Sequence, residues 1–252
     1  MDHFWAIATL ALVGGMIRGD ASAVSLYFQP IAISLELQEA LAYPTFLQDL
    51  TTAQTYRQVG LQARQQGYLA DAIASFKLAV VLAPRVVSGY VLLGWTQHLA
   101  GQRNEAVESL TRALEQDSED VPALNALGIV YLVKGDLGPA IEIHTQAKTL
   151  KPDNEIAYYN LSLAYQRLPE IPLAIENATR ATELEPYNPH PWVALALTHW
   201  SNQDFAAAAT AYQEALRLDG RYFQAYHLDH LTKAGFSPEQ IQVVDEIRLA
   251  LQ

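Results

Sequence analysis

The chain has 252 residues, no cysteine, and 27 acidic against 16 basic residues, which gives a formal net charge of −11. This balance, together with the lack of any basic run, argues against nucleic acid as a partner, because phosphate-binding surfaces need clustered Lys and Arg. Without cysteine the chain has no disulfide framework, thiolate zinc site, iron–sulfur cluster or cysteine nucleophile. Half of the residues are apolar, which is too many for a disordered chain.

The amino-terminal region, residues 1–35, is apolar and its role stays open between three readings. No charge occurs from Phe4 to Ile17, but this run is shorter than the ~20 apolar residues that span a bilayer. It has the length of the apolar part of a signal peptide, and Ala21-Ser22-Ala23 is similar to a cleavage site, although no Lys or Arg precedes it in the usual place. We expect membrane attachment or export, or else helices folded over the next region of a soluble cytoplasmic protein.

A strict repeat of 34 residues follows a predicted amphipathic lead-in helix at residues 36–52. Stepping forward from Leu93-Gly94 gives Leu127-Gly128, Leu161-Ser162 and Leu195-Ala196, and stepping back gives Val59-Gly60. Two alanine columns keep the same spacing: Ala72, Ala106, Ala140, Ala174 and Ala208, and then Ala79, Ala113, Ala147, Ala181 and Ala215. The period predicts five units over residues 53–222, with bounds at 53–86, 87–120, 121–154, 155–188 and 189–222.

The repeated residues predict two packed helices in each unit. A small residue on the first helix lets the second helix approach closely, and the alanine columns receive it. Gly67, Gly101 and Gly135 are expected to end first helices in the left-handed conformation, and Pro84 and Pro152 to stop second helices. Because no unit can bury its apolar face alone, the units are expected to stack into an all-α solenoid.

Residues 223–252 are predicted to form capping helices. One is expected from Tyr222 to Ala234, stopped by Gly235, and another begins with Ser237 as N-cap and Pro238 at its first position. The last helix is expected to bury Ile241, Val244, Ile247 and Leu251 and to expose Glu239, Gln240, Gln242, Asp245, Glu246 and Arg248. A solenoid needs a terminal helix of this kind, with a polar outer face, to remain soluble.

The array resembles tetratricopeptide repeats, whose unit has this length and the same order of large, small, alanine and proline positions. The third unit matches best, with Leu124, Leu127, Gly128, Tyr131, Ala140, Ala147 and Pro152 in place. The fourth unit departs from the pattern at Ser162 and Ala178, and the fifth at His199 and Gly220. The resemblance covers residues 53–222 and implies a right-handed α-solenoid of five helix pairs that binds another protein.

The resemblance also implies a binding groove on the concave face, lined by the first helices. Its expected lining is Arg57, Leu61, Arg64, Val91, Trp95, His98, Asn125, Ile129, Leu132, Tyr159, Leu163, Gln166, Val193, Leu197 and Trp200. Most of these side chains are apolar or aromatic, so we expect the groove to take an amphipathic helix or an extended apolar peptide of a partner protein. The alternative is that several of them contact neighbouring repeats and are core residues.

One subset of the family clamps chaperone carboxyl termini with converging Lys, Arg and Asn side chains. Here Val91, Trp95 and Ala126 stand on the corresponding wall. Because a carboxylate needs converging cations and amide donors, we expect no ligand of that kind.

No pattern in the chain predicts catalysis, a cofactor or a metal site. Gly14-Gly15 is not followed by the Lys-Ser or Lys-Thr of a phosphate-binding loop, and no G-x-S-x-G or H-E-x-x-H sequence occurs. His227 and His230 can share a helix face, but Asp229 lies off that face and a metal needs further ligands. We expect these two histidines to form a polar helix face, and His144 and His199 to be packing residues.

Two functional hypotheses remain. In the first, the protein is a non-enzymatic scaffold that assists the assembly of a membrane-associated complex. A hydrophobic amino end followed by five such units resembles membrane-biogenesis repeat proteins of cyanobacteria and plastids, as does the Asn154–Ala164 run, which would make the complex photosynthetic. In the second, it is an exported or structural repeat protein whose amino-terminal segment fills its own groove.

Overall fold

The computed structural model describes residues 49–251, and all regular elements in this range are helices. The predicted all-α class is therefore confirmed. The expected anchor or signal segment at residues 1–35 lies outside the described residues, as does most of the expected lead-in helix. Between residues 49 and 251, no helix is both long enough and apolar enough to cross a bilayer.

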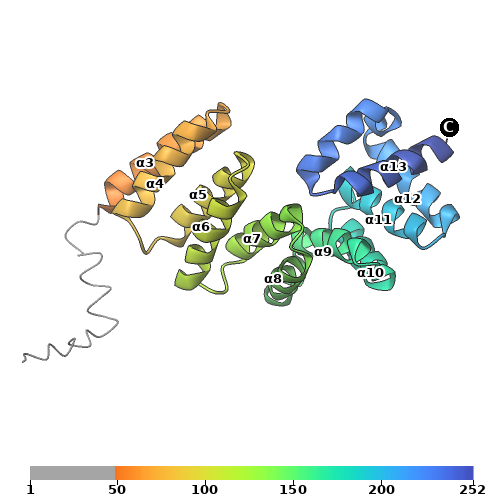
Figure 1. Ribbon diagram of the computed structural model, residues 1–252, viewed down its shortest axis with the longest axis horizontal. Coiled ribbons are helices and arrows are strands. Elements are labelled where there is room, and N and C mark those ends of the chain that lie inside the picture. The colour runs from red at the N-terminus through yellow and green to blue at the C-terminus, as the bar shows by residue number, and fades with distance from the viewer. Residues whose placement is uncertain (1–48, 252) are drawn as a thin grey trace, which may run out of the picture. The chain divides into compact units, whose positions relative to one another are not determined.

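Ten of the described helices form five consecutive pairs (Figure 1). The pairs are α3 (Leu50–Gln65) with α4 (Leu69–Leu82), α5 (Val87–Leu99) with α6 (Arg103–Gln116), α7 (Val121–Lys134) with α8 (Leu137–Leu150), α9 (Glu155–Arg167) with α10 (Ile171–Leu184), and α11 (Pro189–Ser201) with α12 (Phe205–Leu218). Each first helix packs mainly on its own second helix, and the neighbouring first helices α5, α7, α9 and α11 also contact one another. The first helices therefore share one face of the stacked array.

The two helices of a pair touch where the sequence places a small residue. A Cβ atom added to Gly94 would lie 2.6 Å from Cγ of Leu110, and one added to Gly128 would lie 2.5 Å from Nε2 of His144. The first alanine column is completely buried in all five pairs, at Ala72, Ala106, Ala140, Ala174 and Ala208. The predicted close approach is confirmed, and so are the left-handed turns, since Gly67, Gly101 and Gly135 have φ of 84°, 79° and 90°.

The region after α12 differs from the expected α-helix. It consists of two 3₁₀-helices, η2 (Gly220–Phe223) and η3 (Ala225–Ala234), although 3₁₀-helices are usually shorter than η3. The expected stop and cap are confirmed, because Gly235 has φ of 90° and α13 (Pro238–Ala250) starts with a capping box between Ser237 and Gln240.

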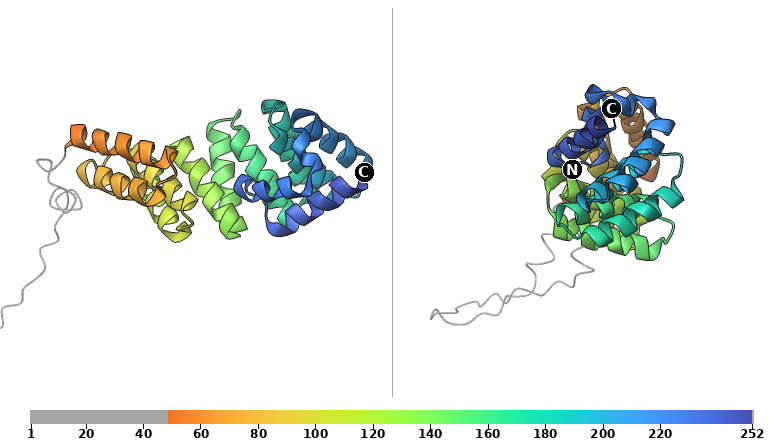
Figure 2. Two further views of the ribbon diagram at one scale, coloured as in Figure 1. Left: turned by 90° about the horizontal axis from the view of Figure 1, so that it is seen from above. Right: turned by 90° about the vertical axis from the view of Figure 1, so that its right-hand side faces the viewer.

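The C-terminal segment, residues 220–251, folds back over the first helices as well as covering the end of the array (Figure 2). Helix α13 contacts both helices of the last pair, and Nε2 of Gln240 donates to the carbonyl of Leu163 (3.1 Å) on α9. The expected exposure of Gln240 and Arg248 is therefore wrong, since these side chains are 2% and 9% exposed. The expected burial of Val244 and Ile247 is confirmed.

We predict that Gly94→Ala lowers the free energy of unfolding by about 1–3 kcal/mol, because its methyl group would overlap Leu110 and force the two helices apart. The matched control is Gly220→Ala, at an exposed position where nothing lies within 4 Å of the added carbon; it should leave stability unchanged or slightly higher. Urea denaturation of both variants measures this. Equal stability of the Gly94→Ala variant and the wild type would contradict the close packing.

His144 makes stability depend on pH. The side chain is completely buried, and burial lowers its pKa from 6.5 to about 3. The unfolded chain therefore binds a proton below pH 6.5 that the folded chain does not, so stability is full above this pH and decreases as the pH falls towards 3. The variant His144→Leu has the residue that the second pair carries at Leu110. We predict that, between pH 7.5 and 5, its free energy of unfolding decreases by about 2 kcal/mol less than that of the wild type. Parallel pH dependence in the two proteins, measured by urea denaturation, would contradict this.

Candidate functional site

The predicted groove lining separates into two groups. Ten side chains are partly exposed: Arg57, Leu61, Arg64, Val91, Trp95, His98, Ile129, Tyr159, Gln166 and Trp200. Five are buried: Asn125, Leu132, Leu163, Val193 and Leu197. Their assignment to an open groove is corrected here, because they contact other parts of the chain and belong to the core.

The buried positions have identifiable partners. Asn125 exchanges two hydrogen bonds with the side-chain amide of Asn154, with lengths of 3.1 and 2.9 Å, so it is a structural link between repeats rather than an adaptable contact for a partner. Leu132 and Leu163 lie against Gly235. Val193 and Leu197 belong to the same buried cluster as Val244 and Ile247 of α13 and are covered from that side.

The C-terminal segment holds this covered part of the face by specific contacts. The hydroxyl of Tyr159, on α9, donates to the carbonyl of Ala234 at 2.6 Å, and the Tyr159 ring packs near that of Phe236, with centroids 6.3 Å apart. Burial raises the pKa of Tyr159, so its hydroxyl stays protonated and remains a donor. One of the two sequence hypotheses placed the amino-terminal segment, which lies outside the described residues, in the groove. Among the described residues, the C-terminal segment covers part of α9 and α11.

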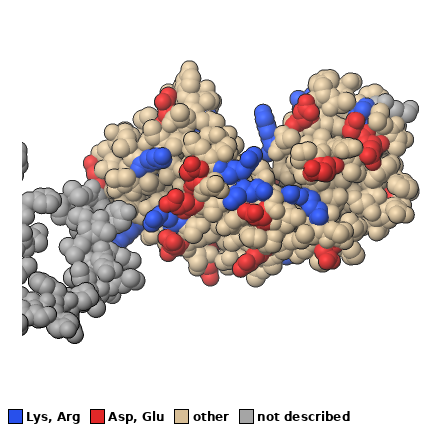
Figure 3. Space-filling view, in the orientation of Figure 1, with Lys and Arg blue, Asp and Glu red and all other residues tan. Residues whose placement is uncertain are grey.

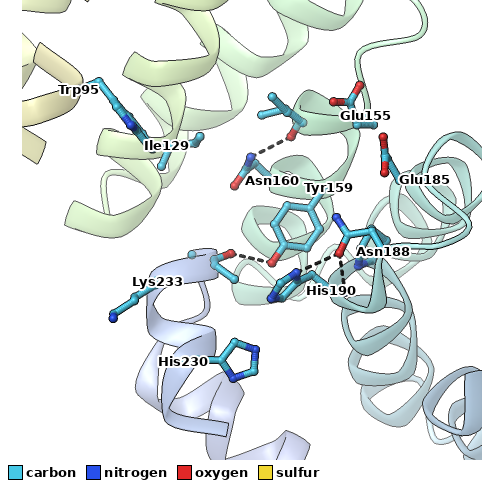
Figure 4. A pocket seen from close by; sticks show the side chains of 14 residues that line it. Trp95, Ile129, Glu155, Tyr159, Asn160, Glu185, Asn188, His190, His230 and Lys233 are labelled. Atoms are coloured by element: carbon cyan, nitrogen blue, oxygen red, sulfur yellow. Dashed lines mark hydrogen bonds between the residues drawn. The ribbon is translucent and has the colours of Figure 1, made fainter. Parts of the chain in front are cut away.

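The uncovered part is a cavity of about 630 Å³ between the first helices and the end of η3 (Figure 4). Its apolar wall includes three of the predicted residues, Trp95, Ile129 and Tyr159, and also Ile156 and Pro191. Its polar lining is Glu155, Asn160, Glu185, Asn188, His190, His230 and Lys233. The space-filling view shows a hollow in this part of the array (Figure 3).

Two of the predicted aromatic residues have different roles. Trp95 stacks on His98, with ring centroids 5.1 Å apart, which holds the indole at the cavity wall. Trp200 packs edge-on against Phe205 at 4.7 Å and against the core cluster of the last pair, and it does not line the cavity. Trp95 is therefore the more informative residue for binding experiments.

A cluster of histidines joins η3 to α11. The rings of His227 and His230 lie 4.0 Å apart, and that of His190 lies 5.4 Å from His230. Nε2 of His230 is hydrogen-bonded to the hydroxyl of Tyr222 (3.0 Å) and Nδ1 to the carbonyl of His227. With both ring nitrogens engaged, His230 has no lone pair free for a metal, and residues 49–251 contain no group of three ligand side chains that could hold one.

The charge states of His190 and His227 follow from their burial. Burial lowers the pKa of His190, and the neighbouring His230 lowers it further; burial is also the main cause of the lowered pKa of His227. The two imidazoles are therefore neutral near pH 7, which allows the rings to pack closely. Sequence reasoning did not connect His190 with this group, because it lies on another helix and no local pattern relates the two regions.

Comparisons with known proteins agree on the fold. Two family models, both described as tetratricopeptide repeat, match residues 99–155 and 189–222. No curated protein matches the chain significantly. Among solved structures, MamA is 25% identical and covers 68% of this chain and 93% of its own, with a TM-score of 0.59.

Two further solved structures are similar in fold. MamA from Desulfovibrio magneticus is 20% identical, with a TM-score of 0.61, and the match covers 67% of this chain and 96% of that one. PilF from Pseudomonas aeruginosa is also 20% identical, with a TM-score of 0.63, and the match covers 79% and 87% of the two chains. Residues 99–155 and 189–222 therefore match tetratricopeptide repeats, and the stacked helix pairs share the solenoid fold of these structures.

We predict that Tyr159→Phe loosens the C-terminal segment without unfolding the array. Loss of one buried hydrogen bond of about 1 kcal/mol should speed amide exchange in η3 roughly fivefold. Hydrogen exchange measured by mass spectrometry tests this, with Tyr187→Phe as the control, because Tyr187 is 84% exposed. If both variants exchange like the wild type in η3, the tyrosine does not hold the segment.

Proposed function

We propose that this tetratricopeptide-repeat protein is a non-enzymatic scaffold that binds a segment of another protein in the cavity between its first helices and η3. Tetratricopeptide repeats serve as protein-interaction scaffolds. The supporting observation is the cavity itself, which keeps Trp95, Ile129 and Tyr159 at an uncovered surface. Large aromatic side chains next to such a cavity are typical anchors of protein interfaces.

The polar groups of the cavity favour binding over catalysis. His230 uses both ring nitrogens within the protein, and Nδ1 of His190 lies 2.9 Å from the side-chain oxygen of Asn188. A catalytic base needs a free nitrogen within reach of a nucleophile or a substrate proton. The hydroxyl that His230 contacts belongs to Tyr222, which is completely buried and does not line the cavity, so it is out of reach of a substrate there.

We also propose that the protein acts at a membrane. The uncharged run from Phe4 to Ile17 supports membrane association through residues 1–35, and with it a role in assembling a membrane-associated complex. The photosynthetic version of this role rests on the sequence resemblance alone.

A second candidate is a structural repeat protein that fills its own groove and takes no dedicated ligand. The observation in its favour is the coverage of α9 and α11 by the C-terminal segment, through Gln240 and the carbonyl of Ala234. The uncovered cavity next to this segment favours the scaffold.

We predict that Trp95→Ala loses partner proteins that the wild type binds. Tagged full-length proteins would be recovered separately from the membrane and soluble fractions of the host, and the bound proteins identified by mass spectrometry. If residues 1–35 associate with a membrane, the wild type is recovered in the membrane fraction. Because the indole is an anchor at the cavity wall, its loss should weaken binding about tenfold or more.

The matched control is Tyr187→Ala, which removes an aromatic side chain that is 84% exposed and does not line the cavity. It should retain all partners, and circular dichroism should show that both variants are folded. Identical partners for Trp95→Ala and the wild type would place binding elsewhere on the protein. Capture of nothing by any of the proteins would favour the self-filled structural repeat.

A further inference from the structure

We propose that the cavity selects a partner segment in which a Lys or Arg stands next to a large apolar residue, with the cation meeting Glu155 and Glu185. This inference rests on the proposed function and specifies its ligand. Both glutamates line the cavity, and Figure 4 shows them on the same side of it, near the aromatic ring of Tyr159.

The two carboxylates have no cation of their own. None of the ion pairs between described residues includes Glu155 or Glu185, and no hydrogen bond to either side chain is formed in this part of the chain. Both residues are half-buried, so their charges are less well hydrated than those of fully exposed glutamates. A cationic group that enters the cavity would compensate this loss of hydration with charge-assisted hydrogen bonds.

Local helix stability does not explain Glu185. This residue is the C-cap of α10, where the helix dipole is negative and a carboxylate is unfavourable. Glu155, in contrast, lies in the first turn of α9, where a negative charge is favourable. Asp117 and Asp219 are acidic C-caps of the equivalent helices α6 and α12, so an acidic residue at this helix end recurs in the repeats. Glu185 differs from them in lining the cavity together with a second carboxylate and an apolar wall.

The other residues of the cavity wall indicate which side chains the ligand carries next to its basic residue. Trp95, Ile129 and Tyr159 supply apolar surface for one large side chain. Lys233, the one Lys or Arg in the described lining, lies on the opposite side from the glutamates (Figure 4) and has no ion-pair partner among residues 49–251. A second cation on that side of the ligand would be repelled, so the basic residue belongs on one side of the apolar residue only.

The size of the cavity limits how much of the partner enters. A volume of about 630 Å³ lies within the range of pockets that hold drug-sized molecules. A few residues of the partner therefore fill it, and the other contacts are made along the rim, where Lys and Arg side chains gather around the hollow in Figure 3.

The test uses three sets of short labelled peptides that differ in one residue. Each peptide carries a pair of Leu, Phe or Trp residues preceded by Lys, Gln or Glu, in an otherwise uncharged sequence. Binding to the full-length protein is measured by fluorescence anisotropy. We expect the Lys peptides to bind about tenfold more tightly than the Gln peptides, and the Glu peptides more weakly still. The advantage of Lys should shrink with added salt.

The double variant Glu155→Gln/Glu185→Gln should bind Lys and Gln peptides equally. Its matched control, Glu170→Gln/Glu176→Gln, removes the same net charge from exposed positions around and within α10 and should keep the wild-type order. Lys233→Gln should leave the preference for Lys intact.

The outcomes separate this inference from the proposed function. If the wild type binds all three sets equally, or if the double variant keeps the preference for Lys, the two glutamates are only hydrated surface groups and the inference is wrong, while apolar binding in the cavity still stands. If no peptide binds, the inference is also wrong, and the proposed function then depends on the comparison of Trp95→Ala with the wild type.

Discussion

The structure depends on the close contact between the two helices of each repeat. At Gly94 and Gly128 the first helix has no side chain, and Leu110 and His144 of the second helix occupy the space where one would be. This contact brings the backbones together and orients the second helix. A glycine stands at this position in the first three pairs, at Gly60, Gly94 and Gly128, and the small residues Ser162 and Ala196 replace it in the last two, so the stacking is regular. The first helices are consequently held side by side on one face. The walls of the cavity come from this face.

The C-terminal segment converts that face into a bounded site. Without it, α9 and α11 would expose a broad apolar surface through Leu163, Val193 and Leu197, which are all completely buried in the folded chain. Two polar contacts tie the segment to α9: Tyr159 of α9 donates to the carbonyl of Ala234 in η3, and Gln240 of α13 donates to the carbonyl of Leu163 in α9. Exposing such an apolar surface carries a large cost in water. The segment therefore contributes to stability, and it leaves only part of the face of first helices uncovered.

Sequence reasoning succeeded where the structure is local and repeated. The glycine turns, the buried alanines and the Ser237 cap each depend on residues within one unit or one helix end, so their period or spacing is sufficient to predict them. It failed where contacts join regions far apart in the sequence. Gln240 has the polarity of a surface residue, and only the position of α13 over α9 explains its burial.

The same distinction applies to the site. The repeat register pointed to Trp95, Ile129 and Tyr159, which line the cavity in the structure, but it treated Leu132 and Leu163 as equivalent to them. These two are covered because the chain reverses at Gly235, whose left-handed φ of 90° directs Phe236 onto Tyr159 and returns α13 across α11. Trp95 and Ile129 stay uncovered at the cavity wall, and Lys233 of η3 lies on the other side of the cavity from Glu155 and Glu185 (Figure 4). The turn at Gly235, which itself lines the cavity, thus marks the boundary between the covered and the uncovered parts of this face.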